Sequence, residues 1–345
     1  MMDTKEQTTR EQVKAFCARI GNDPLLVQGA GGNVSWKDGD TLWVKASGTW
    51  LVDSVAKEIF VPVELDDLRQ AIAKKNFHAT PKVVGNTKLR PSIETLLHAL
   101  MPHKVAVHLH AVEILAHLVR ADPVAEFKKL IGSAIKWCFV DYFKPGAELA
   151  EAVSAQMIQQ PDVDVVFLKN HGVVIGGMNV ADIEIILQSL LLLLKNTMAP
   201  LLVDGGVAES AFLVRSQTYS LCSCPEVNQL ATNSYLSSRL ESEWVLYPDH
   251  AVFLGSQAAI LGSSINSADL DAVVDDKPAF VFDVGAGVYE SKTATTAQKA
   301  QLRCYYDVVI RQPVTERLVA LSHESIAELL DWDAEKYRQS KSTIL

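Results

Sequence analysis

The sequence predicts an α/β fold in which helices flank a largely antiparallel sheet. Short apolar segments of strand length alternate along the chain with helical patterns. Two of the strand segments meet at Lys37–Asp40, whose sequence KDGD is typical of a β-hairpin turn. The 345 residues are 48% hydrophobic and 21% charged, which indicates a globular chain of one large or two ordinary domains. Interleaved helices and hairpins of this kind favour helices packed on an antiparallel sheet.

Local patterns justify the elements of the first part of the chain. Residues 7–21 form an amphipathic helical pattern, and residues 24–48 predict a pair of strands. A helix is expected over 64–75, and another over 90–101, where Pro91 suits the first turn. The next expected elements are a β-branched strand starting at Val105, helices over 112–119 and 147–159, two strands within 163–175, and a long helix over 179–194.

The pattern breaks around Met198–Gly206, which contains Pro200 and Gly205-Gly206. We therefore expect one domain over 1–205 and a C-terminal α/β extension over 206–345. The extension should contain a helix near 226–242, strands near 251–254 and 279–283, and helices over 293–310 and 312–331. Gly285-Ala-Gly287 lacks a third glycine and a following βαβ unit, so it predicts a turn and not a dinucleotide site.

Charge and composition exclude several classes of protein. The net charge is −9 and no cluster of Lys and Arg is present, which argues against nucleic-acid binding. The five cysteines have no regular spacing, as expected for reduced thiols in the cytoplasm. The first residues lack the apolar core of a signal peptide. The most apolar run, 183–194, is too short to span a bilayer, so we expect a cytoplasmic protein without a membrane partner.

Two histidines of the expected strand form the first candidate site. His108 and His110 are two residues apart, so their side chains point to the same side of a strand. Such a pair is either half of a transition-metal site or a pair of hydrogen-bonded core histidines. His171 lies in a turn between two apolar segments. Together with Glu94 it would complete a tetrahedral set of metal ligands. Glu94 could equally be a charge that complements a helix dipole.

Four sequence blocks occur in the order found in one family. They are Gly31-Gly32-Asn33-Val34-Ser35, Lys45-Ala46-Ser47-Gly48, Pro91-Ser92-Ile93-Glu94 with His98, and His108-Leu109-His110 with Asn170-His171-Gly172. With these blocks, roughly residues 8–200 of the chain resemble the class II aldolase/adducin superfamily, whose zinc-dependent members are typified by fuculose- and rhamnulose-phosphate aldolases. The resemblance implies the class II aldolase fold, an α/β/α sandwich. In the extension, Pro248-Asp249-His250, Phe282–Gly287 and Trp332–Arg338 resemble the corresponding region in the aldolase part of bifunctional rhamnulose-phosphate aldolase/dehydrogenases.

The resemblance also implies a site and a reaction. His108, His110 and His171 would bind Zn²⁺, or another divalent metal, with Glu94 as a fourth ligand in the resting enzyme. Glu94 would then leave the metal and move the proton at the donor carbon. The phosphate of the substrate would bind at small polar positions, namely Gly32, Asn33, Ser47, Gly48 and Ser92, which could otherwise be ordinary turn residues. The implied reaction cleaves a ketose 1-phosphate to dihydroxyacetone phosphate and an aldehyde.

The chain departs from the family pattern at Ile93, where many members carry a second hydroxyl residue. Losing that hydrogen bond would cost about 1.5–3 kcal/mol if it is charge-assisted. Arg90 or Lys45 could compensate, or the substrate is not phosphorylated. Tyr142, four residues before Gly146, matches the family's tyrosine that reaches a neighbouring subunit and gives a proton to the aldehyde oxygen. The alternative for Tyr142 is a packing aromatic residue.

If Tyr142 has the family role, the protein is a homo-oligomer, and the resemblance implies a homotetramer. His98, one turn after Glu94, either orients that carboxylate or packs. Two other functions use the same sequence features. A sugar-phosphate epimerase or dehydratase would share the metal site, although epimerases of the family typically carry Asp at the position of Glu94. A non-enzymatic adducin-like interaction module would have lost the metal ligands, which this chain retains.

Overall fold

The computed structural model describes residues 4–196, 216, 218–261 and 277–342. It divides into two compact units, one of Met1–Leu118, Asp122–Lys195 and Asp333–Leu345, the other of Val119–Ala121 and Asn196–Trp332. The boundary that we expected at residue 205 lies outside the described residues. Residues 333–342, which we placed in the extension, form the helix α15 (Asp333–Ser342) and belong to the first unit.

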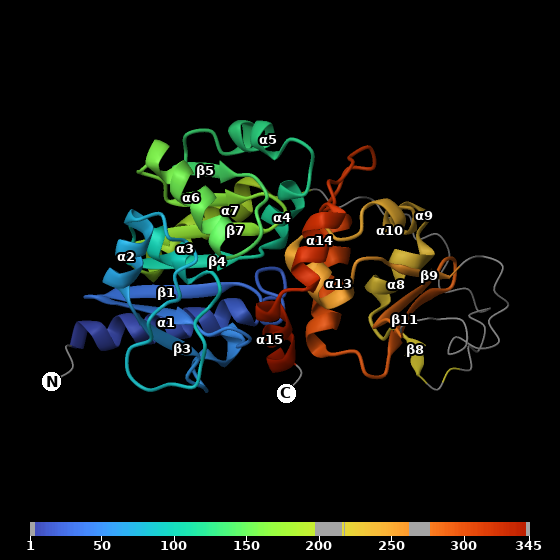
Figure 1. Cartoon of the computed structure of the whole chain (residues 1–345). Helices are drawn as coiled ribbons and strands as arrows, with labels where there is room; N and C mark the ends of the chain where they lie inside the picture. The colour runs from blue at the N-terminus through green and yellow to red at the C-terminus, as the bar shows by residue number, and fades with distance from the viewer. Residues whose placement is uncertain (1–3, 197–215, 217, 262–276, 343–345) are drawn as a thin grey trace. The chain divides into compact units, whose positions relative to one another are not determined.

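The first unit is built on a seven-stranded sheet with the order β3-β2-β1-β4-β7-β6-β5 (Figure 1). All neighbouring strands are antiparallel except β5 and β6, which confirms the predicted, largely antiparallel sheet. The strands are β1 (Asn33–Asp38), β2 (Thr41–Lys45), β3 (Phe60–Glu64), β4 (Val105–Leu109), β5 (Trp137–Val140), β6 (Val165–Leu168) and β7 (Gly172–Gly177). The predicted hairpin is β1–β2, and the edge strands β3 and β5 were not predicted.

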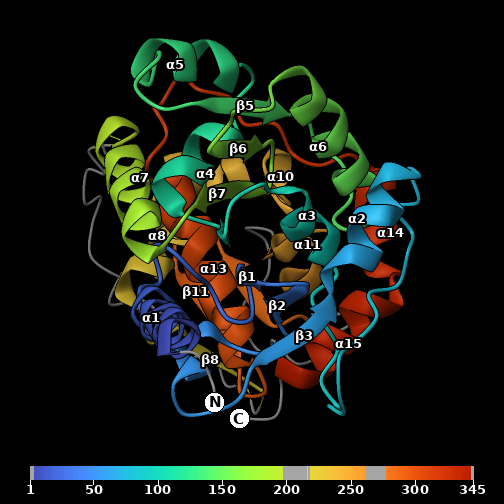
Figure 2. The ribbon, with the colours of Figure 1, turned by 90° about the vertical axis from the view of Figure 1, so that its left-hand side faces the viewer.

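Helices cover both faces of this sheet, as Figure 2 shows for α1 and α7 on one side and α2 and α6 on the other. The helices are α1 (Thr4–Gly21), α2 (Leu65–Ala73), α3 (Thr95–Leu100), α4 (Val112–Leu118), α5 (Pro123–Leu130), α6 (Ala147–Gln159) and α7 (Val180–Leu193), with the 3-10 helix η1 (Leu51–Ser54) before β3. Ala106 of β4 packs with Leu97 of α3 and Val153 of α6 in one core cluster. His108 is two residues further along β4, so it faces the same helix layer.

One prediction near the site was wrong in its bounds. The helix expected over 90–101 begins only at Thr95, with Glu94 at its N-cap. Residues 90–92 are extended instead, because Arg90 precedes a proline and is therefore biased away from helical backbone. The segment pairs with the end of β2, where Ser47 N donates to Arg90 O over 2.9 Å and Ser92 N donates to Lys45 O over 3.1 Å. Residues 45–48 and 90–94 are thereby held side by side.

The second unit carries a four-stranded sheet of order β8-β11-β10-β9, as expected for an α/β extension. Its elements are β8 (Tyr219–Leu221), α8 (Pro225–Thr232), α9 (Ser234–Ser237), α10 (Arg239–Ser242), α11 (Pro248–Leu254), β9 (Ala259–Leu261), β10 (Phe280–Asp283), β11 (Gly287–Ser291), α13 (Thr296–Val309) and α14 (His323–Leu330). The strand predicted at 251–254 is wrong, because these residues lie in α11, which Pro248 begins. The helix predicted over 312–331 is reduced to α14, after an irregular segment that contains Pro313. None of the described helices is both long and apolar enough to cross a membrane.

Candidate metal centre

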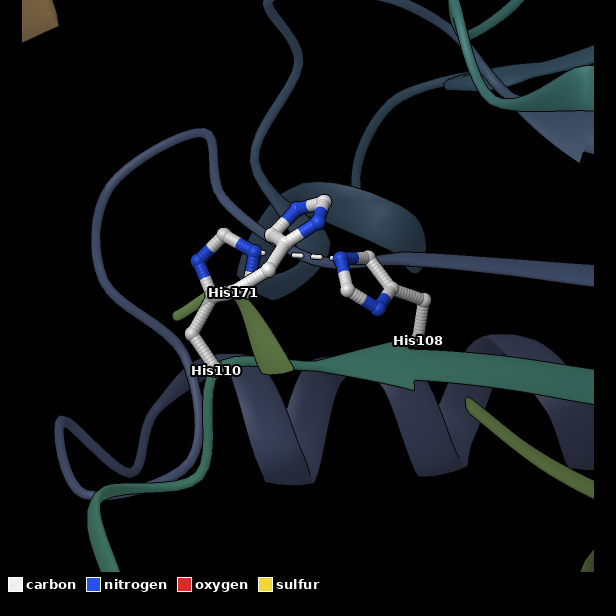
Figure 3. A group of neighbouring side chains, drawn as sticks. All are labelled: His108, His110 and His171. Carbon is white, nitrogen blue, oxygen red and sulfur yellow. Dashed lines mark hydrogen bonds between the residues drawn. The ribbon is translucent and has the colours of Figure 1, made fainter. Parts of the chain in front are cut away.

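His108 lies near the end of the central strand β4, which pairs with β1 and β7, and His110 directly follows the strand. Both side chains are buried, and their Nε2 atoms are 3.1 Å apart. Their rings are nearly perpendicular, with centroids 4.9 Å apart. The two imidazoles are therefore neighbours on one side of the strand, as the two-residue spacing predicts (Figure 3).

His171 reaches this pair from the turn between β6 and β7. Asn170 has a left-handed backbone with φ 52°, and His171 N donates to Leu168 O over 3.1 Å, which closes the turn. A Cβ on Gly172 would lie 2.4 Å from Leu109 O and 3.1 Å from ring carbons of both other histidines. Only glycine lets this turn come so close to β4. One ligand atom of each histidine lies within 4.8 Å of the other two, so the three histidines form one cluster.

Glu94 faces this cluster from the N-cap of α3. Its Oε2 is 3.6 Å from His108 Nε2, and its Oε1 is 3.6 Å from His171 Nε2. Oε2 accepts a hydrogen bond of 2.7 Å from Asn33 Nδ2, whereas Oε1 is buried and has no hydrogen-bond partner among the described residues. Burial favours a raised pKa, but His108, His171 and the Asn33 amide outweigh it and lower the pKa of Glu94 to about 2. The residue is therefore a carboxylate.

These side chains fit a divalent metal ion. His108 Nδ1 lies 3.2 Å from Val173 O, and an N–H donated to that carbonyl leaves the Nε2 lone pair for a metal. The 3.1 and 3.6 Å separations of the ligand atoms are close to the roughly 3.3 Å between nitrogens of a tetrahedral zinc shell. The buried Oε1 of Glu94 gains a partner if an ion is bound. Three imidazoles and one carboxylate are also the donor set that zinc accepts.

Three of the expected phosphate-binding residues lie next to Glu94 or β4. Gly32 has φ +61°, and a Cβ there would lie 2.9 Å from His108 O, so the position needs glycine for close approach to β4. Asn33 binds Glu94 through its amide nitrogen. Ser92 Oγ accepts a hydrogen bond of 3.2 Å from Glu94 N. Asn33 and Ser92 thus contact the carboxylate residue itself.

The other two, Ser47 and Gly48, line a cavity of about 420 Å³ together with Lys88, Tyr337 and Lys341. Gly48 has φ +77°, and a Cβ there would lie 2.7 Å from Lys341 Cβ of α15. The guanidinium of Arg90 lies over the ring of Tyr337, 4.2 Å from its centroid. The cavity is therefore bordered by charges of both signs, with Asp53 and Glu58 beside the lysines, and by a C-terminal helix that sequence patterns did not connect with this loop.

Three further residues named from the sequence are Lys45, Tyr142 and His98. Lys45 is buried and donates to Ala30 O over 3.0 Å. Tyr142 is half-buried in the loop that follows the edge strand β5, and its role in a neighbouring subunit stays a prediction. His98 is fully buried and binds Ser35 and Asn33 through its two ring nitrogens. Ser35 was not predicted as a site residue. It lies two residues after Asn33 on one strand, so its side chain points to the same side, and this spacing could have indicated it.

Comparisons with known proteins relate this chain to one family. The family model of the class II aldolase and adducin N-terminal domain matches residues 11–189, which is just over half of the chain. An L-fuculose phosphate aldolase of Methanocaldococcus jannaschii is 28% identical over 56% of this chain and 98% of its own length. An uncharacterized oxidoreductase of Bacillus subtilis, YuxG, is 28% identical over 46% of this chain, which spans only 25% of that protein.

Among solved structures, the N-terminal class II aldolase domain of a conserved Thermoplasma acidophilum protein is 28% identical. The match covers 52% of this chain and 88% of that one, with a TM-score of 0.43. The match of the family model to residues 11–189 includes β1, β4, the β6–β7 turn and Glu94, which carry the site described above. The chain belongs to the class II aldolase and adducin family.

Proposed function

We propose that the protein is a metal-dependent aldolase that cleaves a ketose 1-phosphate into dihydroxyacetone phosphate and an aldehyde. The convergence of His108, His110 and His171 on Glu94, whose Oε1 accepts no hydrogen bond from the described residues, carries this proposal. Family membership and the fuculose phosphate aldolase among its relatives support the same chemistry. We further propose that zinc is the metal, that the protein is a homotetramer, and that it acts in the cytoplasm, where its five free cysteines would remain reduced.

The side chains have separable roles in this reaction. A divalent ion held by the three histidines would act as a Lewis acid on the ketone and neutralise the negative charge that develops as the carbon–carbon bond breaks. Glu94 would move the proton at the donor carbon, because its Oε1 accepts no hydrogen bond from the described residues while Oε2 stays anchored by Asn33. Tyr142 of a neighbouring subunit would donate the proton to the aldehyde oxygen.

The substrate's phosphate would bind where residues 45–48 and 90–92 run side by side. Backbone and hydroxyl groups of Gly32, Ser47, Gly48 and Ser92 would contact it, and Asn33 is the remaining predicted contact. Ile93 supplies no hydroxyl, and the cations beside the same loop, Lys88 and Arg90, would supply charge in its place.

Metal content and product release test the proposal together. The purified protein should contain about one zinc per chain by elemental analysis, and a chelator should remove both the metal and the activity. Activity is measured as dihydroxyacetone phosphate released from a panel of ketose 1-phosphates. Zinc with turnover but no new aldehyde would establish an epimerase or dehydratase instead. Protein that takes up no metal would refute the metal centre and leave the adducin-like interaction module.

A further inference from the structure

Behind Glu94 lies an unbroken chain of buried hydrogen bonds. Ser35 Oγ is 2.7 Å from His98 Nδ1, His98 Nε2 contacts Asn33 Oδ1, and Asn33 Nδ2 is 2.7 Å from Glu94 Oε2. The exposed fractions of the four residues are 1%, 0%, 6% and 5%. Ser35 and Asn33 come from one face of β1, His98 from α3, and Glu94 from the N-cap of α3. Two rigid elements thus hold the chain.

The donor and acceptor atoms of these hydrogen bonds fix every proton in this chain. Asn33 donates through Nδ2 to Glu94 Oε2 and turns its Oδ1 to Nε2 of His98. That oxygen can only accept, so His98 must carry its proton on Nε2. Nδ1 of His98 then accepts from the hydroxyl of Ser35. The imidazole also stays neutral, because burial, partly opposed by Glu94, lowers the pKa of His98 to about 3.

We propose that Ser35, His98 and Asn33 are positioning residues that hold Glu94 by Oε2 and leave Oε1 facing the histidine cluster. Without them, the carboxylate could rotate and present either oxygen, or bind the metal through both. The inference rests on the proposed function for what Oε1 does, but the hydrogen-bond chain can be measured without any substrate. It also gives Asn33 a role in holding the base, where the family resemblance implied a contact with phosphate.

The tautomer of His98 is the direct test. In protein labelled with ¹⁵N-histidine, the His98 signal is identified by its loss in H98L. Both metal-free and zinc-loaded protein should show a neutral His98 with an Nε2–H that exchanges slowly with water. N33A should lose that protection while its circular dichroism is unchanged. An Nδ1–H tautomer, or an Nε2–H that exchanges rapidly in the native protein, would overturn the proposal whether or not the protein is an aldolase.

Kinetics then separate positioning from phosphate binding. H98L should lower kcat by about 10–100-fold, with KM within about twofold, and speed the transfer of zinc to a chelator. H98Q, whose amide can both accept and donate, should recover part of kcat. H103N is the matched control, because it removes a histidine hydrogen bond of 3.0 Å to Asp164 in the same unit. A rise in KM at unchanged kcat in both H98L and N33A would contradict a positioning role.

Discussion

A single methyl group at Gly172 should disable the metal centre. In G172A the new Cβ would lie 2.4 Å from Leu109 O, whereas ordinary carbon–oxygen contacts are about 3.3–3.6 Å. The β6–β7 turn must therefore move by roughly 1 Å, away from β4 and from the two histidines whose ring carbons lie 3.1 Å away. Designed metal sites tolerate deviations of about 0.2 Å in ligand distance, so His171 should be lost as a ligand.

The expected result is a large loss of metal affinity with a small loss of stability. Overpacking of this kind costs about 1–3 kcal/mol of unfolding free energy. The zinc affinity should fall at least tenfold, measured by competition with a chromophoric chelator. The unfolding free energy is measured separately by denaturant titration of the metal-free protein.

The matched control lies on the same strand. A Cβ on Gly177 would lie 2.9 Å from Asp182 Cβ and 3.2 Å from Asn179 O, away from the histidines. G177A should therefore destabilise the protein by a similar amount and leave zinc affinity unchanged. If G172A binds zinc as tightly as the native protein, or if both variants lose affinity equally, the argument that Gly172 sets the approach of His171 is refuted.

Three further predictions follow from other parts of the molecule. E94Q should retain most of its zinc in elemental analysis but lose proton exchange at the donor carbon, followed by deuterium incorporation; normal exchange would exclude Glu94 as the base. Burial lowers the pKa of His250 to about 3, so the unfolded chain binds a proton that the folded chain does not as the pH falls below about 6.5. The contribution of His250 to the unfolding free energy should be level above that pH and fall by up to about 1.4 kcal/mol per pH unit below it, beside a similar contribution from His98. H250Q should therefore have a shallower slope in urea titrations, and a slope as steep as that of the native protein would refute the role of His250. G48A should clash with Lys341 and strain a left-handed backbone, which should speed hydrogen exchange of α15 amides; unchanged exchange would show that α15 does not depend on this contact.

Local patterns predicted the parts of the site that depend on strand geometry. His108 and His110 share a face because side chains alternate along a strand whatever surrounds it. The turn at His171 was also visible, because Asn-His-Gly interrupts two apolar segments. The pairing of the 45–48 and 90–92 segments was not predicted, since it depends on which backbone groups β2 leaves unpaired.

Errors in the second unit have a related cause. The apolar run of residues 251–254 suits a strand or a buried helix equally, and its burial in α11 is decided by tertiary packing. Pro248 at the helix start was the available signal for the helix. No local pattern could have shown that α15 packs on Gly48, because the two segments are almost 300 residues apart in the chain.

Because α15 belongs to the first unit, residues 196–332 of the second unit form an insertion whose two ends both continue into the first unit. While the insertion is folded, its ends are held at a fixed separation, and α15 stays close to the loop on which it packs. If the insertion unfolds, α15 becomes the end of a long flexible loop, and closing that loop costs entropy that grows with the logarithm of its length. Chain connectivity therefore couples the two units thermodynamically, and a mutation that unfolds the insertion should loosen α15 over Gly48 without altering any residue of the site.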